Sequence, residues 1–242
     1  MDISSNISDL KYIKDRKYSL ADSCLIPQKI ILDGSLTLSA SRYQKACNVL
    51  DAYSQSIESA WALNSTRESR DLSLKALRKI TLNFDKYVNL DNDLASAQAM
   101  IEAANLAGQA INIAKTTAAH AWSYGLTSKY NIPHGHAVWL TLPKIFEIHF
   151  LHSSKNKDSN NEYATLNNTM KKLIEIMQIN NNDFEKYFKN ILNLIGIKSD
   201  IKNDFKISHE ERVSLSKNVN SERLANNPIV FSKFDIDQIF KI

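Results

Sequence analysis

Two histidines, His120 and His134, lie fourteen residues apart, at the end of one helical pattern and the start of another. His120 closes an alanine-rich run that predicts a buried helix, and His134 follows Pro133, where a new helix can begin. Asp51 and Gln55 lie four residues apart on a third helical pattern, so both side chains leave one face of that helix. Three helices are therefore expected to direct two oxygens and two imidazole nitrogens toward one cation.

A mixed carboxylate and imidazole set suits divalent iron or zinc, with manganese and nickel as further options. Because the Gln55 amide oxygen is a weak donor, the predicted site keeps a coordination position open, as catalytic metals require. The same residues also have a simpler interpretation. Asp and Gln are common four residues apart on any helix, and a histidine near a helix end often packs or caps. The residues alone leave both interpretations open.

Tyr124 follows His120 by four residues, so its hydroxyl reaches the same pocket if that helix continues for another turn. There it would donate a proton to a developing alkoxide, although packing as a core aromatic is an equal alternative. His136 is expected in the pocket wall rather than among the ligands. The remaining histidines have polar, lysine-rich sequence neighbours and are expected at the surface: His149, His152 and His209.

The composition bounds the class of protein. The chain has 242 residues with 43% hydrophobic content, enough for a substantial core in one or two domains. Its net charge of +4 comes from interspersed charges, which argues against nucleic-acid binding. Two cysteines imply no disulfide framework and fit a reducing cytoplasm. The most apolar stretch, 137–151, contains charged residues and is too short for a bilayer, and no signal peptide is visible.

Glycine is scarce, and this scarcity is informative. The chain has five glycines, none close enough to another to form a phosphate-binding loop. The sequence therefore contains neither a dinucleotide-binding fingerprint nor a P-loop. Any nucleotide cofactor would have to be held by something other than a glycine-rich turn of this chain.

The hydrophobic period predicts an all-α helical bundle with a short extended N-terminal segment. We expect residues 1–40 to be an N-terminal linker, with a polar start over 1–15 and a strand or extended segment at 28–32. Residues 41–242 should form one helical metal-binding domain. Its helices are expected at 43–63, 65–88, 94–119, 133–150, 162–177, 182–195, 208–218 and 234–241.

Several local signals refine these helices. Ser65 and Glu68 form a capping-box pattern, and Gly196 should close the helix that precedes it. Pro143 should kink or split the fourth helix. Because small residues cover most faces of the third helix, it is expected to be a central helix, packed closely by its neighbours. A polar loop is expected over 153–161.

The residues around the histidines resemble the helical C-terminal domain of the iron-containing (group III) alcohol dehydrogenases, a dehydroquinate synthase-like fold. In that family an Asp-x3-His pair joins two histidines fourteen residues apart in a His…Pro-His-Gly segment. Asp51, His120 and His134 stand at three of these four ligand positions. The small residues at 103–110 and the extended residues 30–33 add to the resemblance, which is firm over 17–150.

Within the family, the residues at 51–66, 123–128 and 134–138 resemble a branch of phosphonoacetaldehyde reductases. This resemblance implies reduction of phosphonoacetaldehyde to 2-hydroxyethylphosphonate with NAD(P)H and a divalent metal, Fe²⁺ first and Zn²⁺ second. A phosphonate would need basic or amide groups, for which the sequence offers Lys115, Arg42 and Asn64. The substrate would be a small aldehyde or alcohol, with no nucleic-acid or membrane partner.

Three departures from the family pattern are visible. Gln55 replaces the usual ligand histidine, which weakens the site, and Tyr124 replaces a further pocket histidine. The family's N-terminal nucleotide-binding domain, with its glycine-rich loop, is also absent from this sequence. The resemblance therefore predicts that this polypeptide alone has little dehydrogenase activity and that it associates with itself through exposed apolar surface.

Two other functions are retained as alternatives: a metal-binding but non-catalytic remnant, and a helical interaction module that binds no metal.

Overall fold

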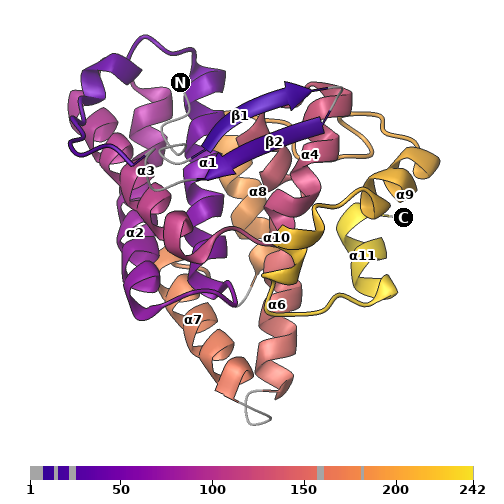
Figure 1. The fold of residues 1–242 in the computed structure, drawn as a ribbon. Helices are drawn as coiled ribbons and strands as arrows, with labels where there is room; N and C mark the ends of the chain where they lie inside the picture. Colours follow the sequence, from indigo (N-terminus) through magenta and orange to yellow (C-terminus); the bar gives the residue numbers. More distant parts are fainter. Residues whose placement is uncertain (1–7, 14–15, 22–25, 157–160, 181–182, 242) are drawn as a thin grey trace.

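The computed structural model describes residues 8–13, 16–21, 26–156, 161–180 and 183–241, and it has the predicted all-α architecture. Figure 1 shows the helices as one bundle around α1 (Arg42–Trp61). The first layer beside it contains α2 (Arg67–Asn89) and α3 (Leu94–Ala114). The other helices are α4 (Ala118–Tyr130), α5 (His134–Trp139), α6 (Leu142–Asn156), α7 (Asn161–Met177), α8 (Phe184–Ile195), α9 (His209–Lys217), α10 (Ser221–Ala225) and α11 (Lys233–Phe240).

The helix at the centre of the bundle is α1. The alanine-rich α3, which was expected to be a central helix, packs against α1 and α2 with part of its surface exposed. From Lys45 to its end, every α1 residue except Asn48 is buried. Its serines tolerate burial because each hydroxyl donates to the carbonyl one turn earlier, as Ser54 does to Leu50 at 2.6 Å. Small, self-satisfied side chains let neighbours pack against α1 on all sides.

The long third helix expected over 94–119 ends earlier, at Ala114. Lys115 has a left-handed backbone, φ 62°, which interrupts the helix, and α4 begins anew with Thr117 as its N-cap residue. The Thr117 hydroxyl makes no cap bond; it donates to the buried Glu58 carboxylate and accepts from the Trp61 indole N–H. His120 therefore lies in the first turn of α4 and not at the end of the preceding helix.

Most other helix boundaries follow the sequence signals. The predicted split near Pro143 is confirmed, since α5 ends at Trp139 and α6 starts at Leu142. Gly196 closes α8 with φ +71°, also as predicted. The capping box of α2 is shifted by one residue and pairs Thr66 with Ser69 rather than Ser65 with Glu68. The short helix α10 was not predicted.

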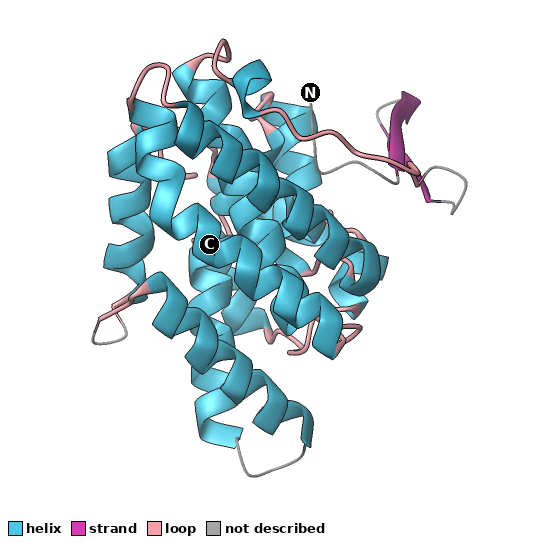
Figure 2. Cartoon of the chain, turned by 90° about the vertical axis from the view of Figure 1, so that its left-hand side faces the viewer, coloured by secondary structure: helices cyan, strands magenta, loops and turns pink. Residues whose placement is uncertain are grey.

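The expected loop over 153–161 also differs, because α6 continues to Asn156; residues 157–160 lie outside the described part of the chain. Figures 1 and 2 show α6 and α7 extending together beyond one end of the bundle.

The N-terminal region contains a β-hairpin, which the sequence analysis missed. β1 (Ser8–Ile13) and β2 (Arg16–Ala21) pair antiparallel, with Leu10 opposite Ser19. Apolar and polar residues alternate here with period two, but each run is short. The hairpin lies outside the helical body (Figure 2). Residues 28–32, where a strand or extended segment was expected, form no strand, and Gln28 lies at a bend. A 3₁₀ turn, η2 (Gly34–Thr37), leads toward α1.

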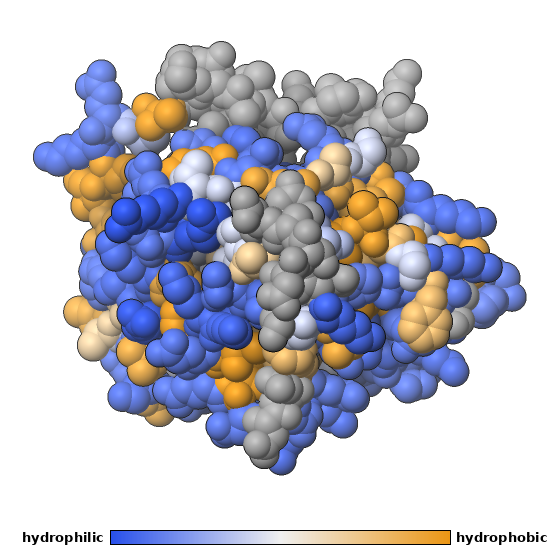
Figure 3. All heavy atoms as spheres, turned by 90° about the horizontal axis from the view of Figure 1, so that it is seen from below, coloured by the Kyte–Doolittle hydropathy of each residue, from blue (hydrophilic) through white to orange (hydrophobic). Residues whose placement is uncertain are grey.

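The outer surface is mixed in character. On the face shown in Figure 3, hydrophilic residues surround small apolar patches. Among the described residues, Ile31 and Leu36 are about four-fifths exposed, at 82% and 77%, in the segment before α1. No helix in the described ranges is both long and apolar enough to cross a membrane.

Candidate metal centre

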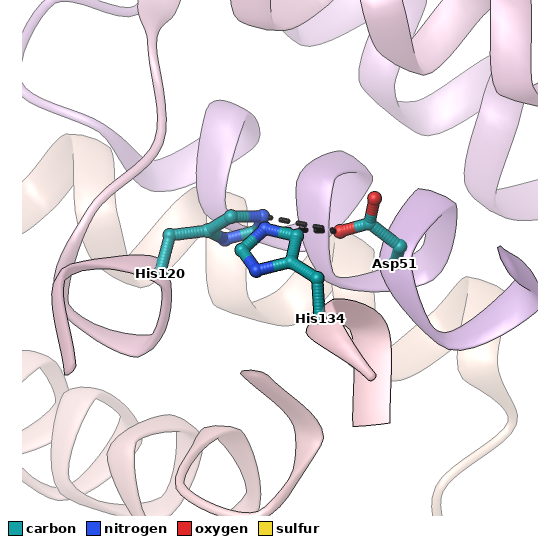
Figure 4. Close-up of side chains that lie close together, drawn as sticks. All are labelled: Asp51, His120 and His134. Carbon is teal, nitrogen blue, oxygen red and sulfur yellow. Dashed lines mark ion pairs between the residues drawn. The ribbon is translucent and has the colours of Figure 1, made fainter. Parts of the chain in front are cut away.

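Three side chains from three helices converge inside the bundle: Asp51 of α1, His120 of α4 and His134 of α5. One ligand-type atom from each lies within 4.8 Å of the other two. Figure 4 shows both imidazoles directed at the Asp51 carboxylate. His120 Nε2 lies 3.3 Å and His134 Nε2 3.8 Å from Asp51 Oδ1. Two ligands of one zinc or iron ion lie about 3.0–3.4 Å apart, so this spacing is close to that of a metal site.

Gln55, the fourth predicted ligand, lies one turn after Asp51 and is buried. Its Nε2 donates to Asp51 Oδ2 at 3.1 Å, which fixes the amide beside the carboxylate. Its Oε1 is buried and finds no hydrogen-bond partner among the described residues. A buried oxygen without a donor is costly unless a cation or water meets it, so the donor set fits a divalent ion.

Glu58 is a residue of the candidate site that the sequence analysis missed. It is fully buried, and its Oε2 forms a very short contact with His120 Nδ1. Its Oε1 accepts from the Thr117 hydroxyl and the Ala119 N–H, each at 2.8 Å. Burial opposes ionisation of Glu58, yet the adjacent imidazole and these donors lower the pKa of the carboxyl. The signal was its position seven residues after Asp51, on the same helix face.

The Glu58 contact determines which ring nitrogen of His120 faces the candidate metal site. Burial opposes the charged form of His120, but the carboxylates of Glu58 and Asp51 outweigh this and raise its pKa. With an ionised Glu58 on Nδ1, that nitrogen holds the proton and Nε2 faces Asp51. A carboxylate behind a histidine in this way orients the ring and makes it a stronger metal ligand.

Tyr124 also lies at the centre, on the α4 turn after His120. Its ring stacks on His134, with centroids 6.2 Å apart and planes 13° apart. The Ser123 hydroxyl lies 3.4 Å from Nδ1 of the same His134 ring. These contacts hold the His134 ring, which is partly exposed, against α4.

Close approach of α5 to α1 depends on Gly135. A Cβ at this position would lie 2.1 Å from the Cys47 carbonyl oxygen and 2.8 Å from the Asp51 backbone nitrogen. Only a residue without a side chain permits this approach. The glycine thus brings His134 within reach of Asp51.

Of the other histidines, one that was expected at the surface is buried. His136 is buried beside the site, accepting from or donating to Tyr43 at 3.0 Å, and burial lowers its pKa. His149 was expected at the surface but is fully buried and stacks on Trp61 at 4.4 Å. Its lysine-rich neighbours in sequence lie on other faces of α6. His152 is partly exposed and His209 exposed.

Two of the three groups suggested for a phosphonate have other partners. Arg42 donates to Asn89 Oδ1 and to the Leu194 carbonyl. Lys115 is exposed and donates to Asn112 of its own turn. Asn64 is exposed at the end of α1.

Comparison with known proteins identifies the family. The profile described as "Fe-containing alcohol dehydrogenase family, C-terminal" matches residues 45–242. The chain therefore belongs to the iron-containing alcohol dehydrogenase family, as its motifs indicated.

Among curated relatives, it is 34% identical over 137 residues to phosphonoacetaldehyde reductase of Streptomyces viridochromogenes, covering 57% of this chain and 34% of that protein. It is 33% identical over 135 residues to probable alcohol dehydrogenase EutG of Escherichia coli, covering 56% and 34%. The chain thus matches about a third of the length of these relatives.

Solved structures agree in fold. Sulfoacetaldehyde reductase from Bifidobacterium kashiwanohense, in complex with NAD⁺, superposes with a TM-score of 0.76 at 24% identity, covering 93% of this chain and 57% of that one. An alcohol dehydrogenase from Oenococcus oeni gives 0.77 at 22% identity, covering 97% and 60%. At this identity the likeness establishes the fold.

Proposed function

We propose that this chain is the metal-binding part of an alcohol dehydrogenase that interconverts a small aldehyde and its alcohol. The observation that carries the proposal is the convergence of Asp51, His120 and His134 with Glu58 behind one imidazole. Fe²⁺ is the first choice of metal and Zn²⁺ the second, because the donors are imidazole and carboxylate. We place this enzyme in the cytoplasm, in keeping with its two cysteines.

Asp51, His120 and His134 would hold the ion, with the Gln55 amide oxygen as a weak fourth ligand. When bound, the ion supplies Lewis-acid polarisation of a carbonyl oxygen. Glu58 would fix the His120 ring, and Tyr124, whose ring stacks on His134, would hold the proton that the alcohol gains or loses. Hydride would come from NAD(P)H.

The cofactor site is proposed to lie largely outside this chain, since the chain matches only a third of its curated relatives. We therefore expect the purified chain to lack NAD(P)H-dependent turnover by itself. Reduction of an aldehyde by the chain alone, lost in His120→Ala, would contradict this expectation.

The proposed substrate is phosphonoacetaldehyde, reduced to 2-hydroxyethylphosphonate. Support comes from the 34% identity to a phosphonoacetaldehyde reductase and from the motifs around Asp51 and His134.

Metal content tests the proposal first. Protein purified anaerobically should contain about one equivalent of divalent metal by elemental mass spectrometry, and the Asp51→Ala/His134→Ala variant should contain none. Absence of metal from both would overturn the proposal and favour a helical interaction module.

The short match to the relatives also favours a second candidate, a metal-binding chain without catalysis. Adding a nucleotide-binding domain of a relative in trans separates the two. Turnover that depends on His120 supports the enzyme, and metal binding without turnover supports the second candidate.

A further inference from the structure

The Arg223 guanidinium lies beside Tyr124, whose aromatic ring packs against the candidate metal centre. The Arg223 Cζ lies 5.6 Å from the centre of the Tyr124 ring, and Tyr124 in turn stacks on His134. Arginine keeps its charge at all ordinary pH values. The candidate metal centre therefore has a permanent cation near it, contributed by a residue more than eighty positions away in sequence.

The helix that contains Arg223, α10, is fixed at both ends to the segment that starts α4. Before it, the Asn220 N–H donates to the Ala121 carbonyl at 3.2 Å. After it, the buried Asn226 amide donates to the Ala114 and Thr116 carbonyls at 2.8 and 3.0 Å. Arg223 is thus placed in advance relative to the helix that holds His120 and Tyr124. A group fixed in this way loses little entropy when it binds a ligand.

Arg223 also keeps most of its hydrogen-bonding capacity. A guanidinium has five N–H donors, and one nitrogen, Nη1, donates to the Thr116 hydroxyl. Within the described ranges, no carboxylate forms an ion pair with Arg223. The side chain is half-buried, so an anion reaching it would be only partly screened by water.

A purely structural role is the competing explanation. The bond to Thr116 and the contact with Tyr124 join α10 to α4, and the loss of either would loosen that junction. Such a structural role requires only the shape of the Arg223 side chain and one N–H donor. It does not require the remaining N–H donors or the positive charge. The two explanations therefore differ in whether Arg223 affects the binding of anions.

We propose that Arg223 determines substrate specificity by binding the anionic end of a short phosphonate-bearing aldehyde or alcohol while its oxygen faces the metal. The inference rests on the proposed function and names the group in this chain that selects its substrate class. The planar fork of a guanidinium matches two oxygens of a phosphonate, which a lysine ammonium would not. A sulfonate presents similar oxygens with less charge and should bind more weakly.

Calorimetric titration of the full chain tests this assignment. The probes are methylphosphonate, 2-hydroxyethylphosphonate and 2-hydroxyethanesulfonate, each added to metal-free and to Zn²⁺-loaded protein. Arg223→Ala removes the charge, and Arg223→Gln removes it while keeping a donor for Thr116. Arg78→Ala, at an exposed α2 position, is the matched control.

We expect both Arg223 variants to weaken binding of the two phosphonates by roughly tenfold to a hundredfold, as for a lost charge-assisted pair. Arg78→Ala should bind them as the wild type does, and zinc affinity should be unchanged in all variants. If Arg223→Ala fails to fold, Arg223→Gln provides the same comparison.

Methylphosphonate binding by metal-free protein separates this inference from the proposed function. A chain that binds no zinc contradicts the proposed function, while Arg223-dependent binding of methylphosphonate would still support the anion site. Equal phosphonate affinity in wild type and Arg223→Gln, or no wild-type binding at millimolar concentration, would overturn the role of Arg223 even if zinc binds.

Discussion

The Glu58 carboxylate contacts His120 at Nδ1, on the opposite side of the ring from Nε2, which lies 3.3 Å from Asp51. Glu58 and Asp51 stand two turns apart on the same face of α1, so one rigid helix places both carboxylates against one imidazole. The ring is therefore held with Nδ1 on Glu58 and with Nε2 directed at Asp51 and the candidate cation site.

This relationship predicts the effect of Glu58→Gln. A glutamine cannot accept from His120 Nδ1, Thr117 and the Ala119 N–H together, because one of its two atoms is a donor. Zinc affinity should fall by roughly 10- to 100-fold, measured by competition with a chelator. The control is Glu102→Gln, whose carboxylate pairs with Lys79 on the surface. An unchanged zinc affinity in Glu58→Gln would show that Glu58 does not orient the ligand.

Gln55→His should strengthen the site. The position is buried one turn from Asp51, and its amide oxygen has no hydrogen-bond partner among the described residues. An imidazole of similar size replaces a weak donor with a strong one, so divalent-metal affinity should rise about tenfold or more. The measurement is the dissociation constant for Zn²⁺ and, under anaerobic conditions, for Fe²⁺.

Gln44→His, an exposed position on the same helix, controls for nonspecific gain from an added histidine. Equal affinities of Gln55→His and Gln44→His would mean that position 55 does not face the metal.

The sequence was sufficient to predict the parts of this molecule that local pattern determines. The period of apolar residues predicted most of the helices but not α4 or α10, and the spacing of Asp51, His120 and His134 predicted their convergence. The break at Lys115 was not predictable from propensity, since the loop is stabilised by tertiary bonds. Thr117 donates to Glu58, and Thr116 accepts from Arg223.

Long-range partners explain the remaining misses. Glu58 meets a histidine 62 residues later; its position seven residues after Asp51 places it on the same face of α1, but the sequence does not indicate which residue it contacts. His149 was assigned to the surface from its sequence neighbours, whereas a helix face buries it against Trp61. The roles of all the predicted site residues in metal binding and catalysis remain predictions: Asp51, Gln55, His120, His134 and Tyr124.

Gly135→Ala should both destabilise the fold and impair metal binding. The added Cβ would meet the backbone of Cys47 and Asp51, and backbone cannot move aside as a side-chain end can. A loss of about 1–3 kcal/mol or more in the free energy of unfolding is expected, measured with urea. His134 would also shift away from Asp51, so the zinc affinity of the folded Gly135→Ala protein should fall.

Gly125→Ala is the matched control, because its Cβ would meet side-chain ends and no backbone: the end of Leu215 at 2.8 Å and Asn218 Nδ2 at 3.8 Å. A smaller effect on stability and none on zinc affinity is expected there. If Gly135→Ala lowered stability and zinc affinity no more than Gly125→Ala, the close approach of α5 to α1 would not require a glycine at position 135.

His149 should make the stability of the fold depend on pH. Burial lowers the pKa of His149 from 6.5 to about 4. Between these two pH values the unfolded chain therefore binds a proton at His149 and the folded chain does not. Stability contributed by the neutral form is therefore complete above pH 6.5 and is lost as the pH falls toward 4. Between pH 7.5 and pH 5 the loss should be about 2 kcal/mol. His149→Phe keeps an aromatic ring against Trp61 but cannot titrate.

Urea unfolding of wild type and His149→Phe at several pH values between 7.5 and 5 measures this effect as the difference between the two proteins. Because every other titrating group is common to both, its contribution cancels unless it touches position 149. His209→Gln, at an exposed position, is the control. Wild type should lose stability relative to His149→Phe as the pH falls. Parallel pH profiles would mean that His149 accepts its proton in the folded state as readily as in the unfolded chain.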